Sequence, residues 1–427
     1  MIPNWAAHLL VGLSGAVGLV HQTLWTRRLV DVLGAGGDTF ARVVGAFFIG
    51  LSLGGAFAAW RPASARHAWR RVAWAELAVG VLSLPVLGSV FLADSFREAF
   101  PLERNPTLAA LLFVTPPAMA MGLVMPAALG ALGSASRGIS LYVANTAGGV
   151  FGVLATVTLL LPRLGLFASG LVGIGANLLL AGAALGFSRS RTRSRDGRTP
   201  RPWIPEAPPI RSSTARLLAF GSGFLTLALE VLLQHQTAQV TINAGHSNAL
   251  VLAFVIAALT LAGAVAGRIR SGSADGARGL VAWAFLATAP IAASEPFVFL
   301  AARPGLRFFA YDHPPFAYLL RVAGLSSLVL LPVFVAGGLV FPLLLRQTAS
   351  RREPGREVAL LLALNGLGGW IGAETAQGWL LPSLGLWTSC CAVAAVAFAG
   401  WIVVRGRSLL RSPVSRSEEH TSELQSR

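Results

Sequence analysis

Residues Asn145–Gly152 read Asn-Thr-Ala-Gly-Gly-Val-Phe-Gly, and Asn365–Gly372 read Asn-Gly-Leu-Gly-Gly-Trp-Ile-Gly. A second pair of segments, Gly122–Pro126 and Gly338–Pro342, reads Gly-Leu-Val-Met-Pro and Gly-Leu-Val-Phe-Pro. Nearer the N-terminus, four further matches occur at a constant separation of 208 residues: Ser14-Gly15 with Ser222-Gly223, Gln22 with Glu230, Gly37 with Gly245, and Gly55 with Gly263. Chance does not align three separated motifs in the same order, so the chain is predicted to be a tandem duplication.

The composition excludes an ordinary soluble domain. Of the 427 residues, 54% are hydrophobic and only 12% are charged, whereas soluble domains carry about 25% charged residues. Apolar stretches near the ~20 residues that cross a ~30 Å hydrocarbon core recur along the whole chain. We count twelve, at 7–32, 40–60, 72–93, 107–132, 140–161, 166–187, 216–241, 247–269, 279–302, 317–345, 358–381 and 385–404. The sequence therefore predicts an all-α polytopic membrane protein.

Each copy of the duplication contains six of these spans. Because six is even, both copies enter the membrane in the same sense, and a pseudo-twofold axis along the membrane normal should relate them. This is the organisation of major-facilitator-like transporters. The expected domains are a first repeat at 1–187, a linker at 188–214, a second repeat at 215–405 and a cytoplasmic tail at 406–415.

The net charge of +16 comes from 34 basic and 18 acidic residues, and every basic residue is Arg. Most arginines lie in the loops after even-numbered spans and after the last one. By the positive-inside rule, both termini are predicted to lie on the cytoplasmic side of a bacterial-type inner membrane. The charge therefore reflects topology and the lipid bilayer as partner, and no nucleic acid is expected to bind. The Arg/Ser-rich and Pro-rich segment 188–214 is expected to be a disordered cytoplasmic linker.

Residues 416–427 break abruptly from the preceding composition and look like the translation of a sequencing-library adapter. They are set aside from fold reasoning. If the reading frame ran into an adapter, the natural chain is expected to continue beyond Ser415, and the sequence is then a fragment.

Several motifs resemble the integral-membrane region of fused spermidine-synthase-like proteins. They are Ser14-Gly15 through Gln22–Arg27, Phe48–Gly54, Gly122–Pro126 and Tyr142–Thr146. The resemblance covers both halves, and in that family the membrane region is often described as major-facilitator-like. It implies a companion soluble aminopropyltransferase domain with a Rossmann fold. The family's first-helix motif often carries an acid, which the second copy keeps as Glu230 and the first replaces by Gln22.

The soluble domain implied by this resemblance is absent from the chain. Gly34–Asp38 mimics a nucleotide-binding loop, but no strand precedes it, so we interpret it as a turn. Three functions remain open: a transporter-like module for a small, possibly polyamine, metabolite; the membrane anchor of an aminopropyltransferase; and a structural scaffold. Substrate, coupling ion and oligomeric state are left open.

Glu230 is the strongest candidate for a binding residue, because a carboxylate within hydrocarbon costs ~3 kcal/mol or more. Ser222, Thr226, Glu230 and Gln234 fall at steps of four and predict one polar stripe on a helix, which Ser14, Gly18, Gln22 and Thr26 repeat in the first copy. Stripes related by symmetry are expected to face a shared cavity, where Glu230 could pair with a cationic amine. The alternative is that Glu230 hydrogen-bonds a neighbouring helix or extends outward toward the membrane surface, assisted by Gln234, His235 and Gln236.

Other polar residues have weaker claims. Glu374 has no acidic counterpart in the first repeat and is either an asymmetric binding site or a polar contact of Gln377. Asn145 and Asn365 are placed near the substrate path, although we prefer a structural role in which small residues let helices approach and the amide bonds across. The glycines in these packing motifs are Gly148, Gly149, Gly152, Gly368, Gly369 and Gly372. Pro126 and Pro342 predict matching kinks, because proline removes a backbone hydrogen bond.

The remaining signals predict no catalytic chemistry. Glu76 and Glu295 are expected at the membrane interfaces, and a set of tryptophans fits interfacial belts: Trp5, Trp25, Trp60, Trp74, Trp379 and Trp401. Cys390 and Cys391 are adjacent in an apolar run and are expected to fill helix surface. No histidine spacing indicates a metal site, and no cofactor is expected.

Overall fold

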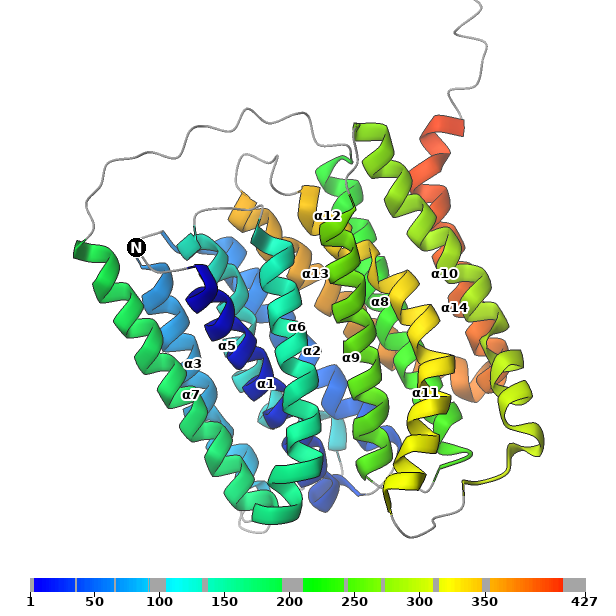
Figure 1. The fold of residues 1–427 in the computed structure, drawn as a ribbon, viewed down its shortest axis with the longest axis horizontal. Helices are drawn as coiled ribbons and strands as arrows, with labels where there is room; N and C mark the ends of the chain where they lie inside the picture. Colours follow the sequence, from blue (N-terminus) through cyan, green and yellow to red (C-terminus); the bar gives the residue numbers. More distant parts are fainter. Residues whose placement is uncertain are drawn as a thin grey trace, which may run out of the picture.

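The computed structural model describes residues 4–34, 37–64, 67–90, 92, 105–132, 137–193, 210–241, 245–269, 273–309, 315–347 and 354–409. These residues form helices joined by short connections (Figure 1). The helices of the first half are α1 (Asn4–Leu33), α2 (Gly37–Trp60), α3 (Ala68–Leu87), α5 (Pro106–Leu132), α6 (Gly138–Ala155) and α7 (Leu161–Arg193). Those of the second half are α8 (Ser212–Ala238), α9 (Gly245–Arg268), α10 (Ala274–Ala302), α11 (Pro315–Gly338), α12 (Val340–Gln347), α13 (Pro354–Thr375) and α14 (Leu381–Leu409).

The helices account for twelve membrane crossings, as the sequence predicts. Within the described residues, nine helical stretches are long and apolar enough to span a bilayer. Two of these stretches, 138–189 and 355–406, are 52 residues long, and each turns back on itself at a glycine with positive φ, Gly165 or Gly385. The remaining crossing is α3, whose apolar character is lowered by Arg70, Arg71 and Glu76 but which packs against α5 and α7.

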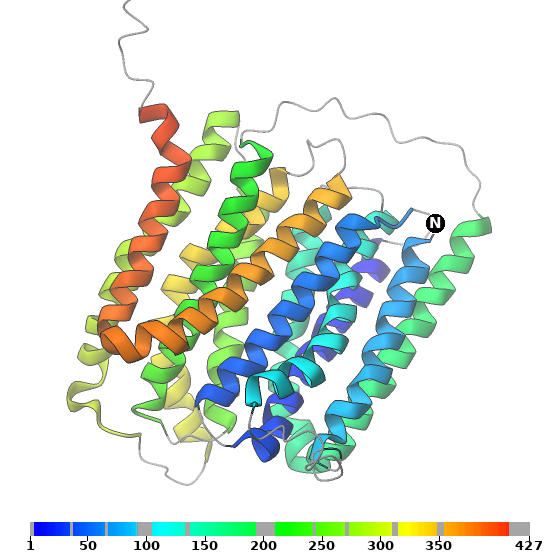
Figure 2. The ribbon, with the colours of Figure 1, turned by 180° about the vertical axis from the view of Figure 1, so that it is seen from behind.

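The two halves repeat the same helix contacts. In the first half α1 packs on α6, α2 on α5, and α3 on α7; in the second half α8 packs on α13, α9 on α11, and α10 on α14. The contacts between halves are also paired, because α2 packs on α13 while α6 packs on α9. In Figure 2 the blue α2 and the orange α13 lie side by side across the boundary between the halves. Exchanging the halves maps one interface onto the other, which is the pairing that a twofold axis produces.

Small side chains let the halves approach each other closely. A Cβ atom built on Gly55 of α2 would lie 3.2 Å from Cβ of Ala363 in α13, and one built on Gly149 of α6 would lie 3.6 Å from the Ile256 side chain in α9. Near the start of α6, the Tyr142 ring packs against Phe341 with ring centroids 5.7 Å apart. Membrane helices associate through such packing because lipid offers no hydrophobic drive between them.

Large apolar side chains on the outer surface fit a lipid environment. Trp5, Trp60, Trp74 and Trp379 are all more than half exposed, as expected for belt residues. Trp25 is different, because its side chain is only 3% exposed and stacks on His21. The expectation that Trp25 lies in an interfacial belt is therefore wrong.

The structure extends the last helix of the first repeat and leaves most of the linker and the tail undescribed. Helix α7 continues to Arg193, beyond the expected end of the first repeat at 187. Residues 194–209 of the linker, 410–415 of the expected tail and the whole of 416–427 are not among those described.

Candidate functional site

The two predicted polar stripes lie on α1 and α8, the first helices of the two repeats. Gln22 and Glu230, at the matching position, are 3% and 4% exposed, so both side chains are inside the bundle. Ser14 and Ser222 occupy a second matching position, and Ser222 is also buried. The stripes are therefore directed away from lipid.

Glu230 has an acceptor that the protein leaves unused. Its Oε1 atom is fully buried and has no hydrogen-bond partner among the described residues, and the same holds for Oε1 of Gln234. The two residues are four positions apart on α8, which places them on the same helix face. A buried polar atom left unpaired costs ~1–3 kcal/mol. The pair is thus an unsatisfied acceptor site within the second repeat.

Glu374 lies at the boundary between the halves. Its Oε1 is 3.2 Å from the position that a Cβ on Gly45 of α2 would occupy. The positive charge of Arg42 in α2 attracts its carboxylate, and the Trp370 side chain hydrogen-bonds to it. Gln377, the polar contact considered above, has its Oε1 2.7 Å from Nε2 of His235. Glu374 thus has a cation and an indole as its neighbours.

Asn145 and Asn365 lie where the first and fifth helices of each repeat cross. A Cβ on Gly15 would come within 2.1 Å of the Asn145 carbonyl oxygen, and one on Gly223 within 1.8 Å of the Asn365 carbonyl oxygen. Asn365 Nδ2 also donates to the Ala219 carbonyl at 3.1 Å. The motif glycines Gly148, Gly152, Gly368 and Gly372 make similarly close backbone approaches to α1 and α8, while Gly149 and Gly369 face the Leu19 and Leu227 side chains.

The prolines of the two repeats have different local effects. Pro126 lies inside a continuous α5, together with Pro116 and Pro117. In the second repeat the corresponding crossing is divided into α11 and α12 by a turn at Leu339, and Pro342 lies in the first turn of α12. Sequence alone predicts the same kink at both places.

A buried polar chain in the first repeat was not anticipated (Ser14, Glu76, Asn177, His21). Glu76 of α3, which the sequence predicts at a membrane interface, is 1% exposed and lies inside the bundle. Ser14 of α1 donates to Glu76 Oε1 at 2.5 Å, and Asn177 Nδ2 of α7 donates to Glu76 Oε2 at 2.7 Å. Asn177 Oδ1 lies 2.8 Å from Nε2 of His21 on α1. Three helices thus contribute to one network.

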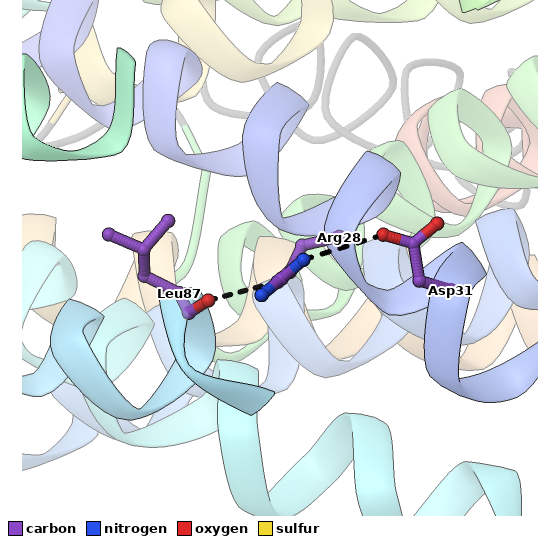
Figure 3. A network of polar contacts seen from close by, with 3 residues as sticks. All are labelled: Arg28, Asp31 and Leu87. Atoms are coloured by element: carbon purple, nitrogen blue, oxygen red, sulfur yellow. Dashed lines mark hydrogen bonds and ion pairs between the residues drawn. The ribbon is translucent and has the colours of Figure 1, made fainter. Parts of the chain in front are cut away.

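A charged group lies beyond His21 toward the C-terminal end of α1. His21, Arg28 and Ser83 line a small pocket formed by α1, α3 and α7. Arg28 Nε donates to the Leu87 carbonyl at 2.9 Å, and its Nη1 lies 3.6 Å from Asp31 Oδ2, as Figure 3 shows. The Asp31 side chain is 54% exposed, so this end of the pocket is close to the surface.

Glu295 is likewise buried, although it was expected at an interface. It is 3% exposed, and its carboxylate faces the Gln236 side chain. Among these residues there is also no group of three His, Cys, Asp or Glu side chains that could hold a metal ion. Cys390 is buried and Cys391 exposed, and both are free.

Solved structures similar to this one are membrane transporters. The proton:xylose symporter XylE has a TM-score of 0.58 at 14% identity, covering 93% of this chain and 94% of that chain. The transporter FucP, in its outward conformation, has a TM-score of 0.55 at 13% identity, covering 95% and 99%. The chain has the major facilitator fold. The human organic anion transporter MFSD10 is more distant, with a TM-score of 0.50 at 14% identity, covering 95% and 100%. No family model and no curated protein sequence matches the chain.

Proposed function

We propose that this protein moves a small cationic metabolite across the membrane by alternating access between its two repeats. The major facilitator fold supports a transporter-like module, since the similar structures XylE and MFSD10 are a proton:xylose symporter and an organic anion transporter. The paired interfaces α2–α13 and α6–α9 give two symmetric surfaces about which the repeats could rock. Small glycine and alanine side chains at these surfaces let the helices of the two repeats approach closely.

The unpaired acceptor atoms on α8 are the reason for proposing a cationic substrate. Glu230 Oε1 and Gln234 Oε1 are buried, adjacent along one helix face, and without a donor among the described residues. An ammonium group is a donor with a positive charge, so it would satisfy both atoms and offset the cost of the buried carboxylate. A sugar would satisfy the hydrogen bonds but not the charge. Gln22, at the matching position of α1, is assigned a neutral contact with the same substrate.

Polyamines are the cationic class that the sequence resemblance favours. The motifs Gly122–Pro126 and Tyr142–Thr146 resemble the membrane region of fused spermidine-synthase-like proteins. A membrane module beside such an enzyme would supply its substrate or export its product. The same resemblance supports the alternative that the membrane helices anchor an aminopropyltransferase domain.

The decisive experiment measures labelled spermidine flux into proteoliposomes that contain the purified protein. Glu230→Gln keeps the side-chain size and removes the charge, so flux should fall to the level of protein-free vesicles. Glu357→Gln is the matched control, because Glu357 pairs with Arg216 at 2.6 Å at the start of α13, away from the stripe. This control should retain flux.

Two results would contradict the proposal at different levels. Spermidine flux that survives Glu230→Gln would remove the site assignment and leave transport intact. Absence of flux for spermidine, putrescine and other amines in the unmodified protein would remove the transport function itself and favour the anchor or scaffold.

A further inference from the structure

The buried chain of Glu76, Asn177 and His21, which Ser14 joins to the polar stripe of α1, is not used by the substrate site proposed above. It joins α1, α3 and α7 within the first repeat, and at its centre is a carboxylate that is 1% exposed. An ionised carboxylate at the centre of a membrane helix costs ~3 kcal/mol by insertion scales. A feature with such a cost calls for either a structural need or a function.

Comparison of the repeats argues against a structural need. Val72–Ala78 reads Val-Ala-Trp-Ala-Glu-Leu-Ala and Val281–Ala287 reads Val-Ala-Trp-Ala-Phe-Leu-Ala, so Glu76 corresponds to Phe285. By the offsets of their own helices, His21 corresponds to Leu229 and Asn177 to Ala397. These three counterparts are buried and apolar. The second repeat therefore builds the same helix contacts with an apolar core at this place, and the fold does not require the polar chain.

The directions of the hydrogen bonds follow from the chemistry of the groups. A carboxylate only accepts, so Asn177 must present its NH₂ group to Glu76 Oε2 and its carbonyl oxygen to His21. Because that oxygen only accepts, Nε2 of His21 carries a hydrogen and donates it. With the Ser14 hydroxyl donating to Oε1, both carboxylate oxygens are satisfied, and the ionised form of Glu76 fits its surroundings.

The protonated form fits as well, after one rotation. A proton on Oε1 makes that atom a donor, so the Ser14 hydroxyl must turn and accept from it. The hydrogen of Ser14 then needs another acceptor. Ser52 and Ser83 use the helix carbonyl four residues earlier, at 2.8 and 2.6 Å, and the Ser14 side chain has to shift to form the same bond. Asn177 continues to donate to Oε2. The step is Glu76–COO⁻ plus H⁺ giving Glu76–COOH; Asn177 and His21 keep their contacts, and only Ser14 adjusts.

We propose that Glu76 is a proton-binding site and that its protonation is coupled to the transport proposed above. Asn177 and His21 act as positioning residues, because the imidazole fixes the amide orientation that Glu76 requires. The coupling rests on the proposed function, whereas proton binding does not. Ser14 links the two sites, since it bonds Glu76 and also belongs to the polar stripe of α1.

The ionisable groups near this site are few. Helix α3 packs against α1, α5 and α7. Helix α5 contains no ionisable side chain between Pro106 and Leu132, and the arginines of α7 lie at its two ends. On α3 itself, Arg70 and Arg71 are more than a turn before Glu76. On α1, His21 faces the site through Asn177, while Arg28 is tied to Leu87 and Asp31 beyond the pocket (Figure 3).

Infrared difference spectroscopy between acidic and alkaline buffer tests proton binding on the full chain. Glu230 and Glu295 are buried as well, so the test is the difference between variants. One component of the buried-carboxyl carbonyl band should appear in the unmodified protein and in Glu357→Gln and be missing in Glu76→Gln. Asn177→Ala should move the pH midpoint of this band without removing it. If Glu76→Gln fails to fold, Ser14→Ala, which removes one donor, should likewise move the midpoint. A band that is the same in all these variants would overturn the proton site.

Proteoliposomes test the coupling separately. An imposed pH gradient should drive spermidine accumulation in the unmodified protein, and Glu76→Gln should lose that accumulation while retaining exchange of labelled for unlabelled spermidine. Accumulation that ignores the gradient, or that persists in Glu76→Gln, would overturn the coupling. If no amine moves under any condition, the proposed function and the coupling fail together, and the infrared band still decides whether Glu76 binds a proton.

Discussion

At the scale of single residues, closely approaching glycines determine how near the helices can lie. Gly223 and Gly221 are both on α8 and two positions apart, yet their surroundings differ. An added Cβ at Gly223 would lie 1.8 Å from the Asn365 carbonyl oxygen, whereas nothing lies within 4 Å of one at Gly221. A methyl group at Gly223 therefore cannot fit unless α8 and α13 separate, whereas a methyl group at Gly221 meets no steric obstacle.

We therefore expect Gly223→Ala to destabilise the folded protein by about 1–3 kcal/mol, the usual cost of overpacking. Gly221→Ala should be neutral or slightly stabilising, because alanine is the better helix former. Thermal unfolding of the two purified variants in the same detergent, followed by circular dichroism, measures the difference. Equal midpoints for both variants would mean that the α8–α13 crossing is looser than its contacts indicate.

The sequence predicts part of this residue-scale picture. The repeated Asn and Gly motifs indicate close helix crossings, because small residues at such spacing have little other use in lipid. The burial of Glu76 could not be predicted in the same way. Its distance from Arg70 and Arg71 along the chain places it near the membrane surface, but the face of α3 that it occupies depends on the packing of α1 and α7.

At the scale of elements, each repeat makes the turn into its last helix by the same device. A π-helical turn, at Thr156–Leu160 or Ala376–Leu380, precedes a Leu-Pro pair. The N–H groups of Leu161 and Leu381 bond the carbonyls five residues earlier, and the following proline has no N–H to continue the helix. A glycine with φ near 70° then completes the turn.

Gly385 should be the residue in this turn that tolerates substitution least. Its φ of 70° and ψ of 171° lie in a region that only glycine adopts readily, so Gly385→Ala should cost about 1–3 kcal/mol of strain. Open space surrounds Gly385, so the cost is conformational and not steric. Gly378→Ala is the control, since it is equally uncrowded and its φ is not positive. Urea or thermal unfolding in detergent should show a loss for Gly385→Ala alone.

The unequal breaks in the proline-containing helices mark the limit of prediction at this scale. The matching residues Pro126 and Pro342 predict matching kinks, but α5 is continuous and the second repeat has a turn at Leu339. Proline removes a hydrogen bond in both cases. Whether the helix bends or breaks depends on neighbours. Gly122 packs on the Leu51 backbone of α2, while Gly338 meets the Leu259 and Ala262 side chains of α9.

At the scale of the whole molecule, the duplication and its six-span units follow from the sequence, whereas the interfaces between repeats do not. Like faces of two copies must meet about a twofold axis. The sequence leaves open which helices form that contact. The structure pairs α2 with α13 and α6 with α9, and this pairing determines where motion of one repeat against the other can be blocked.

Two pairs of positions give a direct test of motion between repeats. A Cβ on Gly55 would lie 3.2 Å from Ala363 Cβ across the α2–α13 interface, and one on Gly338 would lie 3.2 Å from Ala262 Cβ within the second repeat. Both separations are slightly below the ~3.5–4.5 Å of natural disulfides, so a small adjustment allows either bond. The two native cysteines, Cys390 and Cys391, would first be replaced by alanine to give a cysteine-free background.

If the repeats move as two bodies, oxidising Gly55→Cys with Ala363→Cys should stop spermidine flux, and a reductant should restore it. The disulfide between Gly338→Cys and Ala262→Cys joins helices that move together, so flux should persist after oxidation. Mass spectrometry of each preparation establishes that the bond has formed. Full flux through a cross-linked α2–α13 interface would show that the repeats do not need to separate there. A block by both cross-links would instead indicate rearrangement within a repeat, which the shared helix contacts of the two halves argue against.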